Sequence, residues 1–160
     1  MLEKLSQYTL TVELINRNAR IAVILNETTL SRKMIRKTYR QLVGHSASSG
    51  RLMESCQGLT RNTKRFKEAT LFSSIFRVVE TKNKPGNIHN VIQAFDIYKK
   101  SSPSDLLDFT TAWVIARDLR GKKIKVSKCP QCQSSVLLVS ISEKSKDRCF
   151  VCKKVLETTF

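Results

Sequence analysis

In the N-terminal part of the chain, apolar and polar positions alternate with the period of an α-helix. Apolar side chains recur at mostly helical spacing through residues 5–25, and the polar residues 16–18 interrupt them, which predicts one long helix or two abutting helices. After the short polar stretch 26–30, Ser31 is a favourable N-cap for a helix that should end at Gly44. Helix, brief turn and helix is the outline of a helix-turn-helix segment.

Three further helices are predicted in the middle of the chain, each from one apolar stripe. The first should begin near Asn62, and the second should be capped by Asn87. Residues 102–105, Ser-Pro-Ser-Asp, have the sequence of a capping box and predict the start of a third helix, which Gly121 should end. The expected core residues of these helices are Phe66, Ala69, Phe72, Phe76, Val79, Ile88, Val91, Ile92, Phe95, Leu106, Phe109, Trp113 and Ala116.

The predicted helix after Ser31 has two chemically different faces. Ile35, Tyr39 and Leu42 are spaced to pack inward. The outward face carries five cations with no acidic residue three or four positions away: Arg32, Lys33, Arg36, Lys37 and Arg40. Such a face suits a recognition helix in the major groove of DNA, where guanidinium groups reach phosphates or guanine edges. A solvated basic face on an ordinary core helix is the alternative.

The net charge of the chain strengthens the interpretation as a polyanion-binding protein. Lys and Arg number 29 against 13 Asp and Glu, which gives +16. Residues 31–67 carry +9 and residues 120–160 carry +7, while residues 1–30 sum to zero and residues 85–119 to −1. Two separate basic blocks indicate two surfaces for phosphate. The candidates in the second block are Lys122, Lys123, Lys125 and Lys128.

Two Cys-x-x-Cys pairs occupy the last quarter of the chain, Cys129 with Cys132 and Cys149 with Cys152. Each pair can place two thiolates on one tight turn, and together they supply the four soft ligands of a tetrahedral Zn²⁺ site. Four protein ligands leave no position for a catalytic water, so one structural zinc is expected. An iron–sulfur cluster or two disulfides are the alternatives. Cys56 is expected to be a spare, at least half-buried thiol.

The length of 160 residues is enough for one ordinary core and too short for two. We therefore expect a mainly α protein, with a helical domain at residues 1–121 and a zinc module at residues 122–160. The sequence has no signal-peptide pattern and no apolar run near the ~20 residues of a membrane span, which predicts a cytoplasmic protein. It also lacks a phosphate loop, a dinucleotide fingerprint and a nucleophile elbow, so we expect no enzyme and no small-molecule substrate.

A specific combination of motifs runs through the chain. It comprises residues 12–20, residues 27–32 with Leu42, and Thr111-Ala112-Trp113 followed by the two cysteine pairs. Together these motifs resemble the FlhC family, the zinc-containing subunit of the bacterial flagellar master transcriptional activator. The resemblance implies zinc ligation by Cys129, Cys132, Cys149 and Cys152. It also implies a DNA-binding subunit that works with a smaller helical partner, FlhD, and that activates promoters with RNA polymerase.

The middle of the chain departs from that resemblance, because residues 51–70 differ from the tryptophan-containing middle of flagellar members and the tail after Cys152 is short. The departures suggest a relative encoded on a conjugative mobile element. The prediction is therefore a nucleoid-associated activator subunit that binds double-stranded DNA at flagellar or conjugative-transfer promoters. A zinc-stapled RNA-binding or ribosome-associated protein is the alternative.

Overall fold

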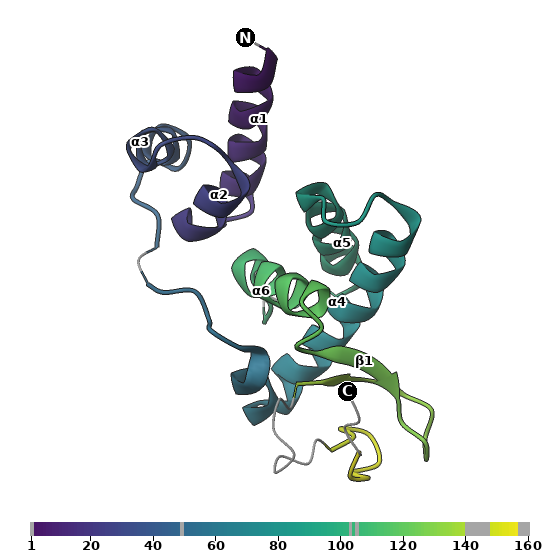
Figure 1. Ribbon diagram of the computed structural model, residues 1–160. Coiled ribbons are helices and arrows are strands. Elements are labelled where there is room, and N and C mark those ends of the chain that lie inside the picture. Colours follow the sequence, from purple (N-terminus) through teal and green to yellow (C-terminus); the bar gives the residue numbers. More distant parts are fainter. Residues whose placement is uncertain (1, 49, 103, 105, 140–147, 157–160) are drawn as a thin grey trace. The chain divides into compact units, whose positions relative to one another are not determined.

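The computed structural model describes residues 2–48, 50–102, 104, 106–139 and 148–156, and these form a mainly helical protein (Figure 1). The chain divides into two compact units. The first unit comprises Met1–Leu52 with Asp108–Thr110, and the second comprises Met53–Leu107 with Thr111–Phe160. The predicted division into a helical domain at residues 1–121 and a zinc module at residues 122–160 concerns which parts fold independently. That division stays a prediction.

Three helices build the first unit. The predicted interruption of the N-terminal helical pattern is confirmed, because the chain turns at Asn18, whose φ is 56°. Helix α3 packs against both preceding helices and buries Ile35 completely, together with Leu14 and Ile24. The helices are α1 (Leu2–Asn16), α2 (Ile21–Glu27) and α3 (Arg32–Val43).

Both predicted ends of α3 are confirmed. The Ser31 hydroxyl accepts a hydrogen bond from the Met34 backbone N–H at 3.3 Å, and Gly44 adopts a left-handed φ of 81° just after the last turn. The prediction that Leu42 packs inward is wrong, because its side chain is 49% exposed. The buried row continues from Tyr39 at i+4 to the half-buried Val43, and Leu42 lies off that row.

The second unit contains three long helices and one short 3₁₀ helix. The Asn62 side chain accepts from the backbone N–H groups of Lys64 and Arg65, and the Asn87 side chain accepts from that of His89, so both predicted caps are confirmed. The aromatic stripe of α4 is buried as predicted. The elements are η1 (Cys56–Arg61), α4 (Thr63–Lys82), α5 (Ile88–Ser101) and α6 (Phe109–Arg120).

The predicted start of the third helix is wrong. Ser102 closes α5 instead, since its backbone N–H donates to the Tyr98 carbonyl at 2.8 Å, and α6 begins only at Phe109. Pro103 and Asp105, the other residues of the expected capping box, lie outside the described residues. Leu106 is 38% exposed and does not belong to the core. The capping-box pattern did not start a helix, because Ser102 caps the C-terminal end of α5.

A two-stranded antiparallel hairpin follows α6. Strand β1 (Lys125–Lys128) pairs with β2 (Ser135–Leu138), so that Lys125 faces Leu138 and Lys128 faces Ser135. The β-prone run at residues 136–141 predicts a ribbon between the two cysteine pairs, whereas the hairpin encloses the first pair as its turn. The Leu137 backbone N–H donates to the Thr70 hydroxyl at 3.2 Å, which ties the hairpin to α4. The polar stretch 143–147 has the composition of a turn and lies outside the described residues.

Candidate metal centre and basic surfaces

The first cysteine pair sits on a tight turn between the two strands. The Cys129 carbonyl accepts from the Gln133 N–H, and the Cys129 N–H donates to the Ser134 carbonyl, both at 2.9 Å. Gln133 takes a left-handed φ of 60°, which lets the chain reverse immediately after Cys132. The second pair repeats these hydrogen bonds at the same distances, through Cys149, Lys153 and Lys154. The chain therefore presents two copies of one metal-binding turn.

The four sulfurs of these turns converge on one point. All four lie within 4.8 Å of one another, with Sγ–Sγ distances of 3.5 Å for Cys129 and Cys152 and 3.6 Å for Cys132 and Cys149. A tetrahedral ion with metal–sulfur bonds of ~2.3 Å separates its ligands by about 3.8 Å, whereas disulfide sulfurs are ~2.0 Å apart. All the cysteines are free thiols. The arrangement fits one metal ion, and a cluster of several irons would hold the sulfurs farther apart.

Hydrogen bonds in the first turn favour the thiolate form that binds metals. The Ser134 hydroxyl and backbone N–H lower the pKa of Cys132 to about 6, and the Cys132 backbone N–H lowers the pKa of Cys129. The Lys154 N–H also acts to lower the pKa of Cys152, but burial and the neighbouring thiols raise that pKa to about 11. Thiolates this close repel one another, and a bound cation would remove the repulsion.

The second turn is anchored to α4 through an aromatic residue that lies between its cysteines. The Phe150 ring meets Phe66 edge to face, with centroids 5.8 Å apart and an interplanar angle of 89°. The Lys67 ammonium lies 5.7 Å from the centroid of the same ring. Sequence analysis did not assign a role to Phe150. This contact joins the metal turn to the first turn of the longest described helix.

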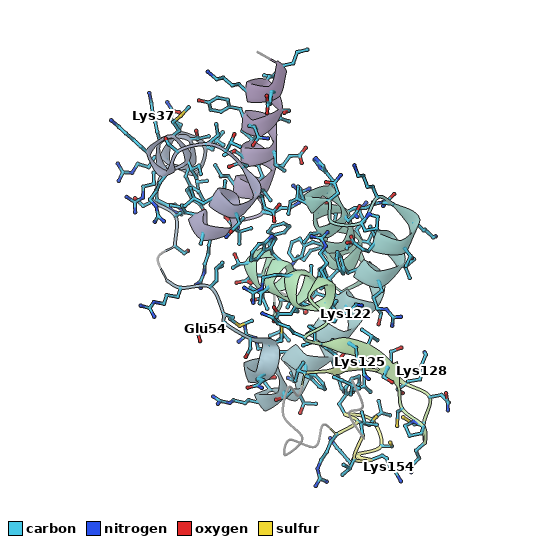
Figure 2. The ribbon with its side chains drawn as sticks, viewed as in Figure 1. Lys37, Glu54, Lys122, Lys125, Lys128 and Lys154 are labelled. Atoms are coloured by element: carbon cyan, nitrogen blue, oxygen red, sulfur yellow. The ribbon has the colours of Figure 1, made fainter. Side chains whose placement is uncertain are left out.

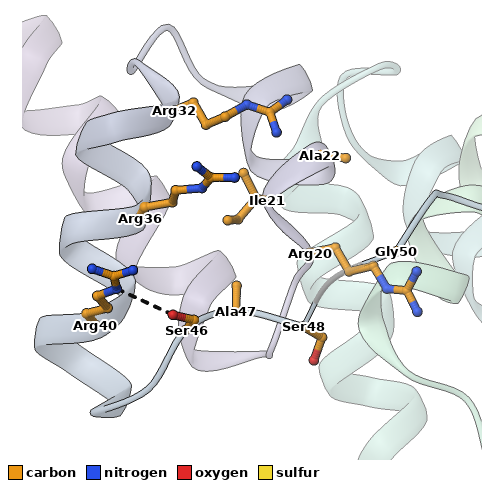
Figure 3. A pocket seen from close by; sticks show the side chains of 10 residues that line it. All are labelled: Arg20, Ile21, Ala22, Arg32, Arg36, Arg40, Ser46, Ala47, Ser48 and Gly50. Atoms are coloured by element: carbon orange, nitrogen blue, oxygen red, sulfur yellow. Dashed lines mark hydrogen bonds between the residues drawn. The ribbon is translucent and has the colours of Figure 1, made fainter.

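The arginine row of α3 lines a cavity in the first unit (Figure 3). The cavity has a volume of about 450 Å³, and Arg32, Arg36 and Arg40 form one wall. The α2 start, residues 46–48 and Gly50 form the remaining walls, and Figure 3 shows Arg20 across from the row, beside Gly50. No acidic residue is among the described residues that line it.

Of the five cations predicted for one face of α3, only the three arginines line the cavity. Lys33 and Lys37 are exposed but are not among the residues that line the cavity. Arg20 lines it and was missed by sequence analysis, because no local pattern connects it to α3. The turn after α2 brings Arg20 and α3 together. The Arg20 Nη1 atom donates to the Arg51 carbonyl at 2.7 Å.

The second basic block follows the hairpin. Figure 2 shows Lys122, Lys125 and Lys128 succeeding one another from the end of α6 along β1, and Lys154 on the second cysteine turn. Lys122, Lys128 and Lys154 are exposed and Lys125 is half-buried, and Lys123, which also belongs to this block, is exposed. The metal turns and these lysines therefore belong to one compact unit.

Cys56 has a structural environment, in keeping with its interpretation as a spare thiol. Its side chain is 1% exposed, and its Sγ donates to the Asp118 carboxylate at 3.3 Å. Burial, and then the neighbouring Asp118 charge, raise the pKa of the Cys56 thiol far above its usual range. A protonated, enclosed thiol is a poor nucleophile.

The fold and the four-cysteine centre define a mainly helical protein with a C-terminal cluster of four cysteines that could hold a metal ion. A family model described as "Flagellar transcriptional activator (FlhC)" matches residues 1–157. The chain belongs to the FlhC family of flagellar transcriptional activators, and the resemblance found in the sequence is confirmed. None of the helices in the described part of the chain is long and apolar enough to cross a membrane.

Several curated relatives are named flagellar transcriptional regulator FlhC. The chain is 27% identical over 150 residues to the protein of Nitrosomonas eutropha, covering 91% of this chain and 78% of the relative. It is 27% identical over 156 residues to that of Cupriavidus metallidurans, covering 95% and 73%. With the protein of Cupriavidus pinatubonensis, the identity is 30% over 135 residues, covering 82% and 64%. The similarity extends through both units.

Proposed function

We propose that the chain is the DNA-binding subunit of a bacterial transcriptional activator. The observation that carries this proposal is the arginine row of α3, which lines a cavity with no acidic residue among its described lining, in a member of a family of transcriptional activators. Cations without neighbouring carboxylates are free to replace the counterions of DNA phosphates. A regulatory family also fits the expectation of a non-enzymatic role.

Two surfaces would contact double-stranded DNA. The first is the basic side of α3, with Arg32, Lys33, Arg36, Lys37 and Arg40. The second is the hairpin block, with Lys122, Lys123, Lys125 and Lys128. Contacts to phosphates would supply most of the affinity and a strong dependence on salt.

We propose that the metal is a single structural Zn²⁺ held by Cys129, Cys132, Cys149 and Cys152. Four sulfurs at 3.5 to 4.8 Å from one another match the tetrahedral thiolate site that zinc prefers. The ion would fold the short tail and so fix the hairpin lysines. It would have no open coordination position and no catalytic part.

The partners proposed are those of the family resemblance. A smaller FlhD-like helical subunit would complete a hetero-oligomer, and RNA polymerase would be recruited at the promoter. Exposed apolar side chains on the first unit, at Leu2, Leu5, Met34 and Leu42, support a protein partner. The regulated genes would be flagellar, as in the family, and conjugative-transfer promoters are the second possibility. Such a role would place the protein at the nucleoid, in the cytoplasm.

The proposal is tested by removing one exposed cation from the hairpin block. Lys123→Gln should weaken binding of a labelled promoter duplex by about fivefold to tenfold at 0.1 M salt, because one phosphate contact is lost. Fluorescence anisotropy of the complex co-expressed with its partner gives the affinity. The matched control is Lys100→Gln, an exposed cation in the nearly neutral segment 85–119, which should bind as the unmodified protein does. Equal losses of affinity in both variants, or no loss in either, would show that the hairpin block lies outside the DNA interface.

A further inference from the structure

The arginine cavity of the first unit has unpaired positive charge on a concave surface. The side chains of Arg32 and Arg36 make no hydrogen bond or ion pair with any described residue, and the Arg40 side chain donates only to the Ser46 hydroxyl, at 3.4 Å. Arg20 lines the opposite side with its guanidinium directed away from the row, beside Gly50 (Figure 3), so the three arginines of α3 supply the charge that faces about 450 Å³. Like charges this close repel one another, so an anion in the cavity would stabilise the unit.

The wall opposite α3 is held in place by Arg20. Its Nη1 atom donates to the Arg51 carbonyl, and its backbone N–H donates to the Thr110 hydroxyl at 3.1 Å. Gly50 has a φ of 131°, and a Cβ atom there would lie 2.9 Å from that Nη1. A residue with a side chain would be strained at this position and would displace the guanidinium. The absence of a side chain at Gly50 therefore allows the Arg20 guanidinium to lie against this loop.

The shape of the cavity distinguishes between two kinds of DNA contact. Base edges lie on the floor of a groove, and a protein reaches them with a convex surface such as a helix inserted into the groove. Backbone phosphates protrude from the duplex, and a concave cationic site encloses them. Guanidinium forks also match the geometry of phosphate oxygens. A concavity lined by arginines, Ser46 and Ser48 therefore suits a phosphate.

We propose that this cavity binds a backbone phosphate of the DNA, so that the arginine row of α3 sets the affinity of the protein and not its sequence preference. This inference rests on the proposed function. It leaves base contacts to other residues, such as Lys33 and Lys37, which do not line the cavity. It also assigns Arg20 and Gly50 a positioning role, since they shape the wall that faces the row.

The experiment compares a promoter duplex with a scrambled duplex of equal length, using the complex co-expressed with its partner. Arg36→Gln should weaken binding to both duplexes by the same factor, about fivefold to tenfold at 0.1 M salt, and should reduce the slope of log K against log salt by about 1. Arg36→Lys keeps the charge and should preserve the ratio of the two affinities. Lys100→Gln is the control, and circular dichroism verifies that each variant is folded.

Three outcomes would overturn the inference. A loss confined to the promoter duplex, or a changed affinity ratio in Arg36→Lys, would show that Arg36 reads a base. An unchanged affinity in Arg36→Gln would show that the cavity lies outside the interface. If the unmodified complex binds neither duplex, the proposed function itself fails. Inorganic pyrophosphate would then reveal a site for a free phosphate if it raises the melting temperature of the unmodified protein and not that of Arg36→Gln.

Discussion

At the scale of single residues, Glu80 is the acceptor that joins three parts of the second unit. Its carboxylate accepts from Arg120 Nε at 2.8 Å, from the Gly86 N–H at 2.9 Å and from the Asn90 side chain at 2.7 Å. It thereby connects α4, the turn after it, α5 and α6. Arg120 also lies 5.3 Å from the centroid of the Phe76 ring, so this polar network borders the aromatic core.

Glu80→Gln is expected to lower the free energy of unfolding by about 1 to 3 kcal/mol at pH 7, because the negative charge beside Arg120 is lost and the amide NH2 group cannot accept the hydrogen bonds that one carboxylate oxygen accepts. Burial alone would raise the pKa of Glu80, but the hydrogen bonds, that from Arg120 foremost, hold it below 4.5. The stabilisation that comes with a lowered carboxyl pKa is fully present above the unfolded-state pKa. It is lost as the pH falls through the folded-state pKa. The difference between the two proteins should therefore shrink below pH 4.5.

Urea denaturation at a series of pH values measures this effect. Glu54→Gln is the matched control, because the Glu54 side chain is exposed. If the two variants lose the same stability at pH 7, the network around Glu80 contributes nothing.

At the scale of elements, α3 depends on the cap that its sequence predicts. Ser31→Ala removes the hydroxyl that accepts from Met34 and should cost about 0.5 to 2 kcal/mol in unfolding free energy. Thermal denaturation monitored by circular dichroism measures the loss. Ser31→Asp restores an acceptor and should recover most of it, whereas equal stability of the alanine variant would show that the cap is unimportant.

The elements that the sequence predicted well are those whose signals are local. Periodicity and caps such as Ser31, Asn62 and Asn87 involve neighbours within four residues, and the structure places them as predicted. Ser102 misled the prediction because one residue carried signals for two helix ends. Arg20 and Phe150 escaped it because their contacts, Arg51 and Phe66, are 31 and 84 positions away and exist only after folding.

For the candidate site, too, the sequence predicted the features that depend on local signals and not those that depend on distant contacts. Cysteine spacing predicted four candidate ligands, because each Cys-x-x-Cys turn is a local structure, and their sulfurs lie within 4.8 Å of one another. The basic face of α3 was also visible as a pattern. Three arginines of this face line a cavity and the two lysines do not, and this division depends on residues 46–48 and Gly50, which no periodicity describes.

At the scale of the whole molecule, the metal is expected to couple folding of the tail to DNA binding. A strong chelator should remove one zinc per chain and unfold the two cysteine turns, because the binding energy of a structural metal is folding energy. Most of the helical signal should remain, since the helices lie between residues 2 and 120. DNA affinity should fall because the hairpin lysines lose their support.

Metal analysis and circular dichroism before and after chelation test this coupling. Cys149→Ser should lose the metal, whereas Cys56→Ser, which alters a cysteine hydrogen-bonded to Asp118, should retain it. A bound iron, or a metal content that is the same in both variants, would contradict the assignment of the site.

The most direct measurement of the central claim is a competition experiment on the co-expressed complex. A labelled promoter duplex is bound at 50 mM and at 200 mM salt, and unlabelled duplex DNA or structured RNA is added as competitor. Duplex DNA should compete better than RNA, and the affinity for the labelled duplex should fall steeply between the two salt concentrations. RNA that displaces the labelled duplex more effectively than DNA does would contradict a DNA-binding activator and would favour an RNA-binding protein.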